Sequence, residues 1–301
     1  MEKNPELSII IVNFNSKKFL KNCLESILSS QLNDLKLETI VVDNASKDDS
    51  FQFVKKNFPW VTVVNSKKNI GFSKANNLGI KKAKGNYILV LNPDTVLSPK
   101  TLLEGIEFME KNPRVGISTC RLELEDGVLD WASHRGFPTP WASFTYFTKL
   151  EETFPKFKIF GQYHLTWKDF GSIHEIDSPA GAFLLIRRKV IEEIGMFDED
   201  FFLYGEDLDF AFRAKQKGWK IMYYPLTTAT HYKGISSGIK GHSQKLTTAN
   251  KKTKLRNLNH FYDAMRIFYS KHYQEKYPSF VNFLTTLAIE LKRKIAFLGV
   301  K

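Results

Sequence analysis

The amino-acid sequence predicts an α/β fold: a mostly parallel sheet with helices on both faces, followed by a helical extension at the C-terminus. In the first 120 residues, short β-branched runs alternate with amphipathic stretches of helical length, a pattern typical of parallel strands joined by helices. The first three runs are almost continuously apolar, as expected for strands that are covered on both faces. With 301 residues, 43% hydrophobic and 25% charged, the chain can bury the core of one large α/β domain.

The expected elements follow one another in a regular order. The first four strands are expected at residues 7–12, 38–42, 61–64 and 87–91, and the helices that follow them at 16–29, 47–57, 72–84 and 99–111. A further strand is expected at 180–186, with helices at 188–193 and 207–217. Residues 121–175 are rich in aromatics with Pro and Gly between them, which predicts long loops and short elements over one end of the sheet. From Thr247 onward the pattern is helical.

The composition excludes several classes of protein. Two cysteines, Cys23 and Cys120, cannot build a disulfide framework and lack a metal-binding spacing, so a reducing compartment is expected. The polar segment Met1–Glu6 carries no signal-peptide core. No stretch reaches the ~18 uninterrupted apolar residues of a membrane-spanning helix, so we expect a cytoplasmic protein.

The positive charge is concentrated near the C-terminus. Residues 241–301 hold twelve of the 44 basic residues but three of the 32 acidic ones, so nine of the twelve net positive charges lie in this tail. Any anionic surface that the protein meets is therefore expected to meet the tail.

Polar side chains follow three of the expected strands. The first strand ends in Val12–Asn15, the second in Asp43–Ser46, and the fourth in Asn92–Thr95. In open α/β sheets, ligands bind at the carboxyl ends of the strands, so three such ends together indicate a ligand site. The alternative is that Asp43 and Asp94 stabilise the turns that follow, where Asp is favoured in any case. No Gly-x-Gly-x-x-Gly and no Gly-Lys-Ser/Thr follows a strand, which argues against a dinucleotide or P-loop site.

Two further groups of residues could carry chemistry. One carboxylate, Asp94, together with a diphosphate would suit Mg²⁺, whereas a lone histidine such as His231 is more often simply packed or exposed. Three acids, Glu206, Asp207 and Asp209, open an expected helix, where they favour the helix dipole. Beside Phe201, Phe202 and Tyr204, one of them is also a candidate general base whose pKa partial burial would raise.

Six segments, in order and spacing, resemble glycosyltransferase family 2, in particular its bacterial rhamnosyltransferase-like branch. The resemblance covers about residues 7–235, and any one segment would be a weak signal. The segments are Val12–Asn15, Val42–Ser46, Asn69–Asn77, Leu91–Thr95, Gly181–Phe183 and Phe197–Asp209.

The resemblance implies a GT-A fold and an inverting transfer from a nucleotide-diphosphate sugar, with Mg²⁺ or Mn²⁺ as cofactor. It assigns Asp207 as general base, with Glu206 beside it, and Asp94 and His231 as metal ligands. Asn92 replaces the first acid of the family's Asp-x-Asp motif, so its contact with the metal is in doubt. The residues expected to bind the nucleotide sugar are Val12, Asn13, Phe14, Asp43, Gly71, Lys74, Asn77, Asn92, Asp94, Gly181 and Ala182.

The expected organisation has a catalytic domain at residues 1–240, divided into a nucleotide-binding half at 1–120 and an acceptor-binding half at 121–240, and a basic helical tail at 241–301. The expected donor is dTDP-rhamnose and the expected acceptor a glycan, in a lipid-linked form, used in cell-surface polysaccharide synthesis. Three alternatives stay open: another nucleotide sugar, a nucleotidyltransferase, and a non-catalytic module that binds nucleic acid through interleaved Lys and aromatics in 251–277. We expect no nucleic-acid partner, because that alternative leaves the acidic strand ends unexplained.

The tail is expected to bring the enzyme to the inner face of the cell membrane. An apolar stripe with helical spacing is flanked by Lys292, Arg293 and Lys294, as in helices that lie in the interface of an anionic bilayer. The alternative is that the stripe packs on the catalytic domain or forms a homodimer. The stripe consists of Phe280, Leu284, Leu287, Leu291, Ile295 and Leu298.

Overall fold

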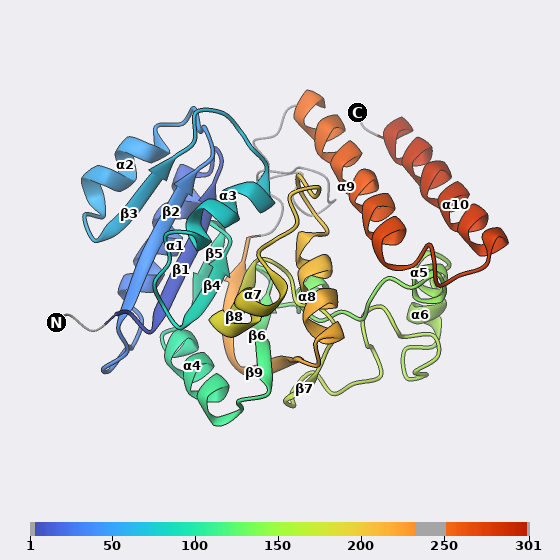
Figure 1. Ribbon diagram of the computed structural model, residues 1–301, viewed down its shortest axis with the longest axis horizontal. Coiled ribbons are helices and arrows are strands. Elements are labelled where there is room, and N and C mark those ends of the chain that lie inside the picture. Colours follow the sequence, from blue (N-terminus) through green and yellow to red (C-terminus); the bar gives the residue numbers. More distant parts are fainter. Residues whose placement is uncertain (1–3, 233–250, 300–301) are drawn as a thin grey trace.

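The fold, seen in a computed structural model, is a single twisted sheet with helices on both faces and two long helices along one side (Figure 1). The structure describes residues 4–232 and 251–299. The expected α/β class with a C-terminal helical extension is confirmed. The expected domain boundary at 240/241 and the expected start of the helical tail at Thr247 lie outside the described residues.

The sheet has a parallel half and a mixed half. Its strands lie in the order β3-β2-β1-β4-β8-β6-β9-β5, and β7 pairs with β9. The first four strands are parallel, whereas β8 runs antiparallel to both β4 and β6. The strands are β1 (Leu7–Asn13), β2 (Leu37–Asp43), β3 (Val61–Asn65), β4 (Tyr87–Leu91), β5 (Thr95–Leu97), β6 (Val115–Glu123), β7 (His174–Glu175), β8 (Phe183–Arg187) and β9 (Lys220–His231).

Two apolar cores lie on the two faces of the sheet because alternate side chains of each strand point to opposite sides. Leu7, Ile9 and Ile11 of β1 pack under α1 (Lys17–Leu28), α2 (Ser50–Asn57) and α4 (Thr101–Lys111). Ile10 and Val12 pack under α3 (Phe72–Ile80), α7 (Arg188–Ile194) and α8 (Glu206–Gln216). The continuous apolar sequence of β1 is thus explained by burial on both faces.

Residues 121–175 form short elements joined by loops, as the composition predicts. Strand β6 extends to Glu123, and a 3₁₀ turn at Trp131–Ser133, α5 (Pro140–Phe147) and α6 (Leu150–Thr153) follow before β7. Thr139 caps α5 by accepting a hydrogen bond from the Ala142 amide, and Pro140 occupies the first turn, where its missing N–H costs nothing.

Several expected boundaries were wrong. The strand expected from Ala180 begins at Phe183, because the Phe183 amide first bonds to the Ala180 carbonyl in a turn. His231 is the last residue of β9. The full extent of strand β9 was hard to predict because Pro225 lies inside it, and its register against β6 shifts between Cys120 and Arg121.

The C-terminal helices are α9 (Lys251–His272) and α10 (Ser279–Leu298). Phe268 and Tyr273 of the α9 segment pack with Phe201 and Phe212, and His272 bonds to Asp209 of α8 at 2.8 Å. Helix α9 is therefore anchored to α8 and the segment before it, and α10 lies along α9 (Figure 1). Within the described residues, no helix has the length and apolar content needed to cross a membrane.

Candidate functional site

The strand order creates a switch point between β1 and β4. From β1 the chain moves outward to β2 and β3, and it then returns to add β4 on the other side of β1. Ligands of open α/β sheets bind at such a point, beyond the carboxyl ends of the strands. The ends of β1, β2 and β4 carry Asn13, Asp43 and Asn92, as the sequence predicts.

Asp43 is held in a buried hydrogen-bond network. Its Oδ1 accepts from Asn13 Nδ2 at 3.0 Å, and its Oδ2 accepts from the Ser46 amide at 3.1 Å. This turn-stabilising role is the alternative that the sequence left open. A carboxylate offers about four acceptor positions, so two remain for a ligand. Val12 is buried beside this network, and Phe14 is half-buried.

Asn44 fixes the Gly71 segment against the end of β2, a role that sequence reasoning missed. Its Nδ2 donates to the Asn69 side chain at 3.1 Å and to the Gly71 carbonyl at 3.2 Å, and its Oδ1 accepts from the Ile70 amide. Gly71 has φ +88°, and a Cβ there would lie 2.6 Å from the Phe202 carbonyl oxygen, so only glycine fits this close approach. The motif 42–46 contains Asn44, but nothing local reveals its partners.

Lys74 and Asn77 both face the segment that leads to α8. Lys74 Nζ lies 3.6 Å from Glu199, and both side chains are half-exposed. The Asn77 side chain is buried and exchanges hydrogen bonds with the Phe197 backbone at 2.9 and 3.1 Å, and it also donates to Glu199. These contacts make Asn77 a support for the segment 197–199, whereas Lys74 keeps an exposed ammonium group beside the Gly71 turn.

Asp94 and His231 come together because β5, which begins directly after Asp94, pairs with the end of β9. Thr95 is the register partner of His231, and His231 Nε2 lies 3.4 Å from Asp94 Oδ1 and 3.4 Å from the Asn92 amide nitrogen. On the other side of the ring, Nδ1 lies 2.8 Å from Asp130 Oδ2. Asp130 is buried, and sequence reasoning missed it.

The charges around His231 favour a cation at this point. Burial lowers the pKa of His231, but the Asp94 and Asp130 carboxylates outweigh this and raise it to about 9. The bond from Nδ1 to the Asp130 carboxylate orients the ring so that Nε2 faces Asp94. Metal-binding histidines are commonly oriented in this way, by a carboxylate bonded to the ring nitrogen that does not bind the metal. Within residues 4–232 and 251–299, no three His, Cys, Asp or Glu side chains gather as a complete metal site. One carboxylate and one imidazole would fit a divalent cation that takes its other ligands from a diphosphate and water.

Asp207, at the start of α8, is bound on three sides. Its Oδ2 accepts from Arg135 at 2.7 Å and from the Gly181 amide at 3.2 Å, while its Oδ1 accepts from the Leu208 amide at 2.8 Å. Both Arg135 and Asp207 are largely buried. The guanidinium compensates the charge of the buried carboxylate and fixes its position. Arg135 was not foreseen, since it lies 72 positions before its partner.

Gly181 and Ala182 connect the two acidic groups. The Gly181 amide bonds to Asp207, and the Ala182 carbonyl accepts from the Asn92 amide at 3.2 Å and from the Thr95 hydroxyl at 3.3 Å. The Asn92–Asp94 turn and Asp207 therefore lie on either side of a two-residue segment. A Cβ on Gly181 would make only ordinary contact with Phe72, so the protein itself leaves room there.

Glu206 is a buried neutral acid at neutral pH. Burial and, next, the charge of Asp207 raise its pKa to about 8, and its Oε2 has no hydrogen-bond partner among the described residues. Because it holds its proton near neutral pH, Glu206 cannot accept one there. Of the two neighbouring acids, Asp207 is therefore the better proton acceptor.

We expect the Glu206→Gln variant to become more stable relative to the native protein as the pH rises. The folded native protein keeps the Glu206 proton where the unfolded chain, with a pKa near 4.5, has lost it, so its unfolding free energy falls through this window. Between about pH 5 and pH 8 the variant should gain up to ~1.4 kcal/mol per pH unit. Urea unfolding at several pH values measures this, with the exposed Glu152→Gln as control; a pH-independent difference would contradict the raised pKa.

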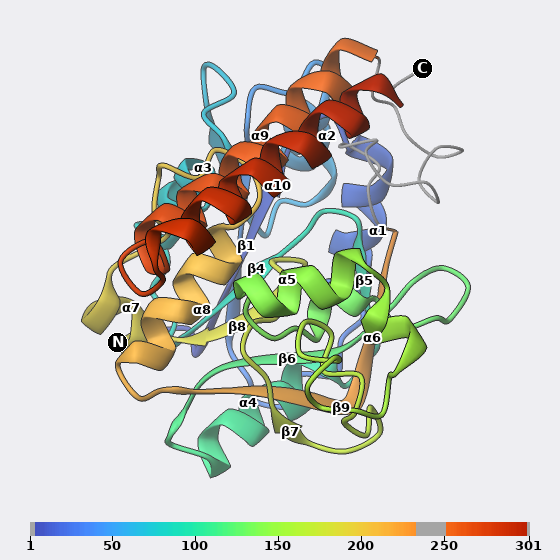
Figure 2. The ribbon, with the colours of Figure 1, turned by 90° about the vertical axis from the view of Figure 1, so that its right-hand side faces the viewer.

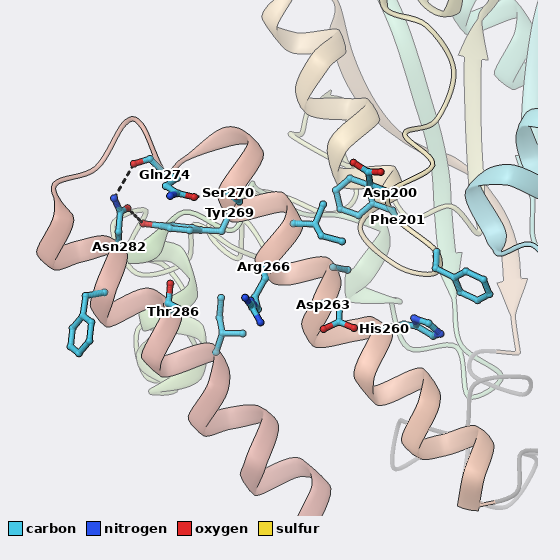
Figure 3. A pocket seen from close by; sticks show the side chains of 15 residues that line it. Asp200, Phe201, His260, Asp263, Arg266, Tyr269, Ser270, Gln274, Asn282 and Thr286 are labelled. Carbon is cyan, nitrogen blue, oxygen red and sulfur yellow. Dashed lines mark hydrogen bonds between the residues drawn. The ribbon is translucent and has the colours of Figure 1, made fainter.

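A cavity of about 740 Å³ lies away from the strand ends, between α9 and α10 (Figure 3). Its walls include Phe202, His260 and Phe283, and the His260 ring stacks on Phe202 with 4.5 Å between centroids. Figure 3 also shows Asn282 joining the two helices at one end, through Gln274 and Tyr269. Phe202 is the link between this cavity and the Gly71 turn.

Comparison with known proteins identifies the family. The model of the family described as Glycosyl transferase family 2 matches residues 8–195. This chain belongs to glycosyltransferase family 2. It is therefore a glycosyltransferase, which removes the nucleotidyltransferase and the non-catalytic nucleic-acid module as alternatives.

Relatives of this family-2 chain confirm the expected rhamnosyltransferase-like branch. It is 27% identical to the rhamnosyltransferase WbbL of Escherichia coli over 235 residues, covering 74% of this chain and 82% of the relative. It is 24% identical to an N-acetylglucosaminyl-diphospho-decaprenol L-rhamnosyltransferase of Mycobacterium tuberculosis, covering 77% and 78%. A low-salt glycan biosynthesis hexosyltransferase of Haloferax volcanii is 27% identical, covering 75% and 67%.

Solved structures that are similar to this chain support the GT-A fold. GalNAc-T7, solved with UDP, GalNAc and Mn²⁺, superposes with a TM-score of 0.57 at 17% identity, over 89% of this chain and half of that one. TarS of S. aureus superposes with a TM-score of 0.53 at 16% identity, over 88% and 72%. At these identities the likeness concerns the fold.

Proposed function

We propose that this enzyme transfers a sugar, with inversion, from a nucleotide diphosphate to a hydroxyl of a glycan acceptor in cell-surface polysaccharide synthesis. The donor we favour is dTDP-rhamnose, because two relatives are named rhamnosyltransferases. The observation that carries the proposal is the pair of acidic groups on either side of Gly181–Ala182. An inverting transfer needs a base on one face of the sugar and charge compensation for the leaving diphosphate on the other.

Asp207 is the proposed general base. Its carboxylate takes the proton of one acceptor hydroxyl as the oxygen forms a bond to the anomeric carbon and the bond to the diphosphate breaks. Arg135 and the Gly181 amide hold Oδ2, which fixes the direction from which the acceptor must approach. Glu206, as a neutral acid, would supply a hydrogen bond rather than accept a proton.

The nucleotide is proposed to lie across the ends of β1 and β2. Asp43 would bind the base beside the backbone of Val12, Asn13 and Phe14, with Asn13 keeping Asp43 in place. The Gly71 turn and the exposed Lys74 would meet the diphosphate. Asn77 is proposed to support this turn through the segment 197–199 rather than to contact the ligand.

Mg²⁺ or Mn²⁺ is proposed as cofactor, held by Asp94 and His231. Such a cation, when bound, would compensate charge on the departing diphosphate. Asn92 is a neutral residue whose amide lies 3.4 Å from the His231 ring, so we propose that it orients the site and the donor. Asp130 would keep His231 in the orientation that presents Nε2.

Asp130→Asn is expected to weaken metal-dependent nucleotide binding about 10- to 100-fold, the usual effect of removing a carboxylate behind a ligating histidine. The shape of the side chain is retained, so the effect should come from the loss of the charged partner of Nδ1. Calorimetric titration of a nucleoside diphosphate with Mn²⁺ measures it, with the exposed Asp126→Asn as control. Unchanged affinity in the Asp130 variant would remove Asp130 from the account.

The acceptor is proposed to be lipid-linked, and the enzyme peripheral on the inner face of the cell membrane. Support comes from the relative whose name includes a decaprenol diphosphate, and from the apolar stripe of α10, which is exposed. The division into a nucleotide-binding half at 1–120 and an acceptor-binding half at 121–240 stays a prediction. A homodimer through α10 is the competing proposal for the stripe.

The donor is tested most simply by hydrolysis. We expect slow release of nucleoside diphosphate from dTDP-rhamnose when the purified enzyme is offered a panel of nucleotide sugars with Mn²⁺. Faster hydrolysis of a UDP- or GDP-sugar would leave the proposed reaction unchanged and show that dTDP-rhamnose is not the preferred donor.

A further inference from the structure

We propose that helices α5 and α6 form a second membrane-contacting element that, with α10, makes one surface lying on an anionic bilayer. The α10 part rests on the function proposed above, whereas the α5–α6 part goes beyond it. We call the exposed apolar group of α5 and of the residues that follow α6 the α5–α6 patch; it consists of Trp141, Phe144, Phe154, Phe157 and Ile159.

The orientation of α10 is the first observation. Its polar residues face α9: Asn282 accepts from Tyr269 at 2.7 Å, Glu290 pairs with Arg266 at 3.3 Å, and Arg293 pairs with Asp263 at 3.0 Å. With 3.6 residues per turn, the stripe from Phe280 to Leu298 lies on the opposite side. Its members are 43 to 88% exposed, and no residue of α10 is buried. The helix thus turns its apolar side outward.

The α5–α6 patch is the second and independent observation. Its members are 41 to 60% exposed, and Trp141 stacks on Phe144 with 5.6 Å between centroids. The Trp141 Nε1–H donates to the Ile159 carbonyl at 2.7 Å, which fixes the patch as a unit. Contiguous exposed apolar groups of this kind mark interaction surfaces, and Trp is favoured where a protein meets the lipid interface.

The two elements lie on one side of the molecule. In Figure 2, α10 lies in front of α9, and α5 and α6 face the viewer beside it. Lys292 of α10 reaches across to α5, with its Nζ 4.5 Å from the centre of the Phe147 ring. A flat surface could therefore touch both elements at once.

The charges around this surface favour an anionic bilayer as the occupant. Lys156 and Lys158 follow α6 beside the patch, while Glu151 is buried against His164 and the charges of Lys149 and Glu152 pair with each other. Lys294 adds an exposed cation on α10. In a twofold contact between two copies, the same positively charged surface would face itself, which is unfavourable. Anionic headgroups meet this surface with opposite charge.

The surface is also close to the proposed chemistry in the chain. Arg135, which binds Asp207, precedes α5 by only a few residues, and Thr139 caps that helix. The chain thus leads directly from the wall of the site that holds the base into the α5–α6 segment.

Fluorescence quenching tests the proposal on the intact chain. We expect vesicles of brominated phosphatidylcholine with phosphatidylglycerol to quench the native protein's tryptophan fluorescence, and the quenching to be mostly lost in Trp141→Phe. Trp60→Phe is the matched control, because Trp60 is also exposed but lies before β3 at the far edge of the sheet (Figure 1). A Phe144→Ser/Phe157→Ser variant should bind the vesicles at least about tenfold more weakly, and high salt should weaken native binding.

Four results would overturn the proposal. Quenching that survives in Trp141→Phe would place another tryptophan, and not the α5–α6 patch, in the bilayer, because α10 contains no tryptophan. Vesicle binding without any quenching would leave α10 as the sole contact. If the native protein does not bind vesicles, the bilayer is not the occupant of this surface. If the native protein is a dimer that dissociates in the Phe144→Ser/Phe157→Ser variant, the occupant is a second copy of the chain. Donor hydrolysis needs no membrane. If the native protein hydrolyses no nucleotide sugar, that result counts against the proposed function but does not bear on the membrane-contacting surface.

Discussion

Asp207→Asn is expected to reduce sugar transfer by roughly 10² to 10⁴, the usual effect of losing a general base. The amide keeps the shape of the side chain and its acceptor oxygen, but it cannot take the proton of the acceptor hydroxyl. Donor affinity should change little, because Asp207 lies on the opposite side of Gly181–Ala182 from the Asn92–Asp94 turn. The measurements are the transfer rate and calorimetric donor binding.

Asp209→Asn is the matched control for this prediction. Asp209 lies two residues further along α8, on the opposite face of the helix, and bonds to Arg213 and His272, so it stabilises the fold rather than facing the site. Its variant should unfold more easily while its folded fraction keeps transferring sugar. Near-normal transfer by Asp207→Asn would remove Asp207 from the role of general base.

Asp94→Ala is expected to abolish metal-dependent nucleotide binding, a loss of more than ~100-fold. Asp94 is the carboxylate that faces His231 beside the Asn92 turn, and no other acid of the described residues shares that position except Asp130 behind the ring. His231→Ala should weaken binding less, because it removes one ligand and leaves the carboxylate. Titration of a nucleoside diphosphate with and without Mn²⁺ measures both.

The exposed Asp34→Ala serves as control for Asp94→Ala and should bind like the native protein. If EDTA leaves both nucleotide binding and transfer unchanged, the metal assignment fails for Asp94 and for His231 together.

The central strands could be predicted because strands buried on both faces have almost continuously apolar sequences. The apolar runs of β1, β2 and β4 are nearly uninterrupted, and the polar residues that end them lie at the switch point as expected. The full extent of strand β9 and its pairing with β5 could not be predicted, because Pro225 lies inside the strand and its register against β6 shifts. That pairing is what brings His231 to Asp94.

The candidate site was predictable only in part, for the same reason. Asp43, Asp94 and Asp207 follow or begin regular elements, and their type and position signal chemistry. Asp130 and Arg135 come from an aromatic-rich segment, and their partners lie 101 and 72 positions away. Such contacts depend on how distant strands are ordered in the sheet, which no local pattern encodes.

The anomeric configuration of the product tests the central claim most directly. With Asp207 as base and the diphosphate leaving on the opposite side, one displacement must invert the configuration of the donor sugar. NMR of the glycan made from the donor that the enzyme hydrolyses reports this configuration from the coupling at the anomeric carbon. We expect a product of inverted configuration; a retained configuration would contradict a single displacement assisted by Asp207.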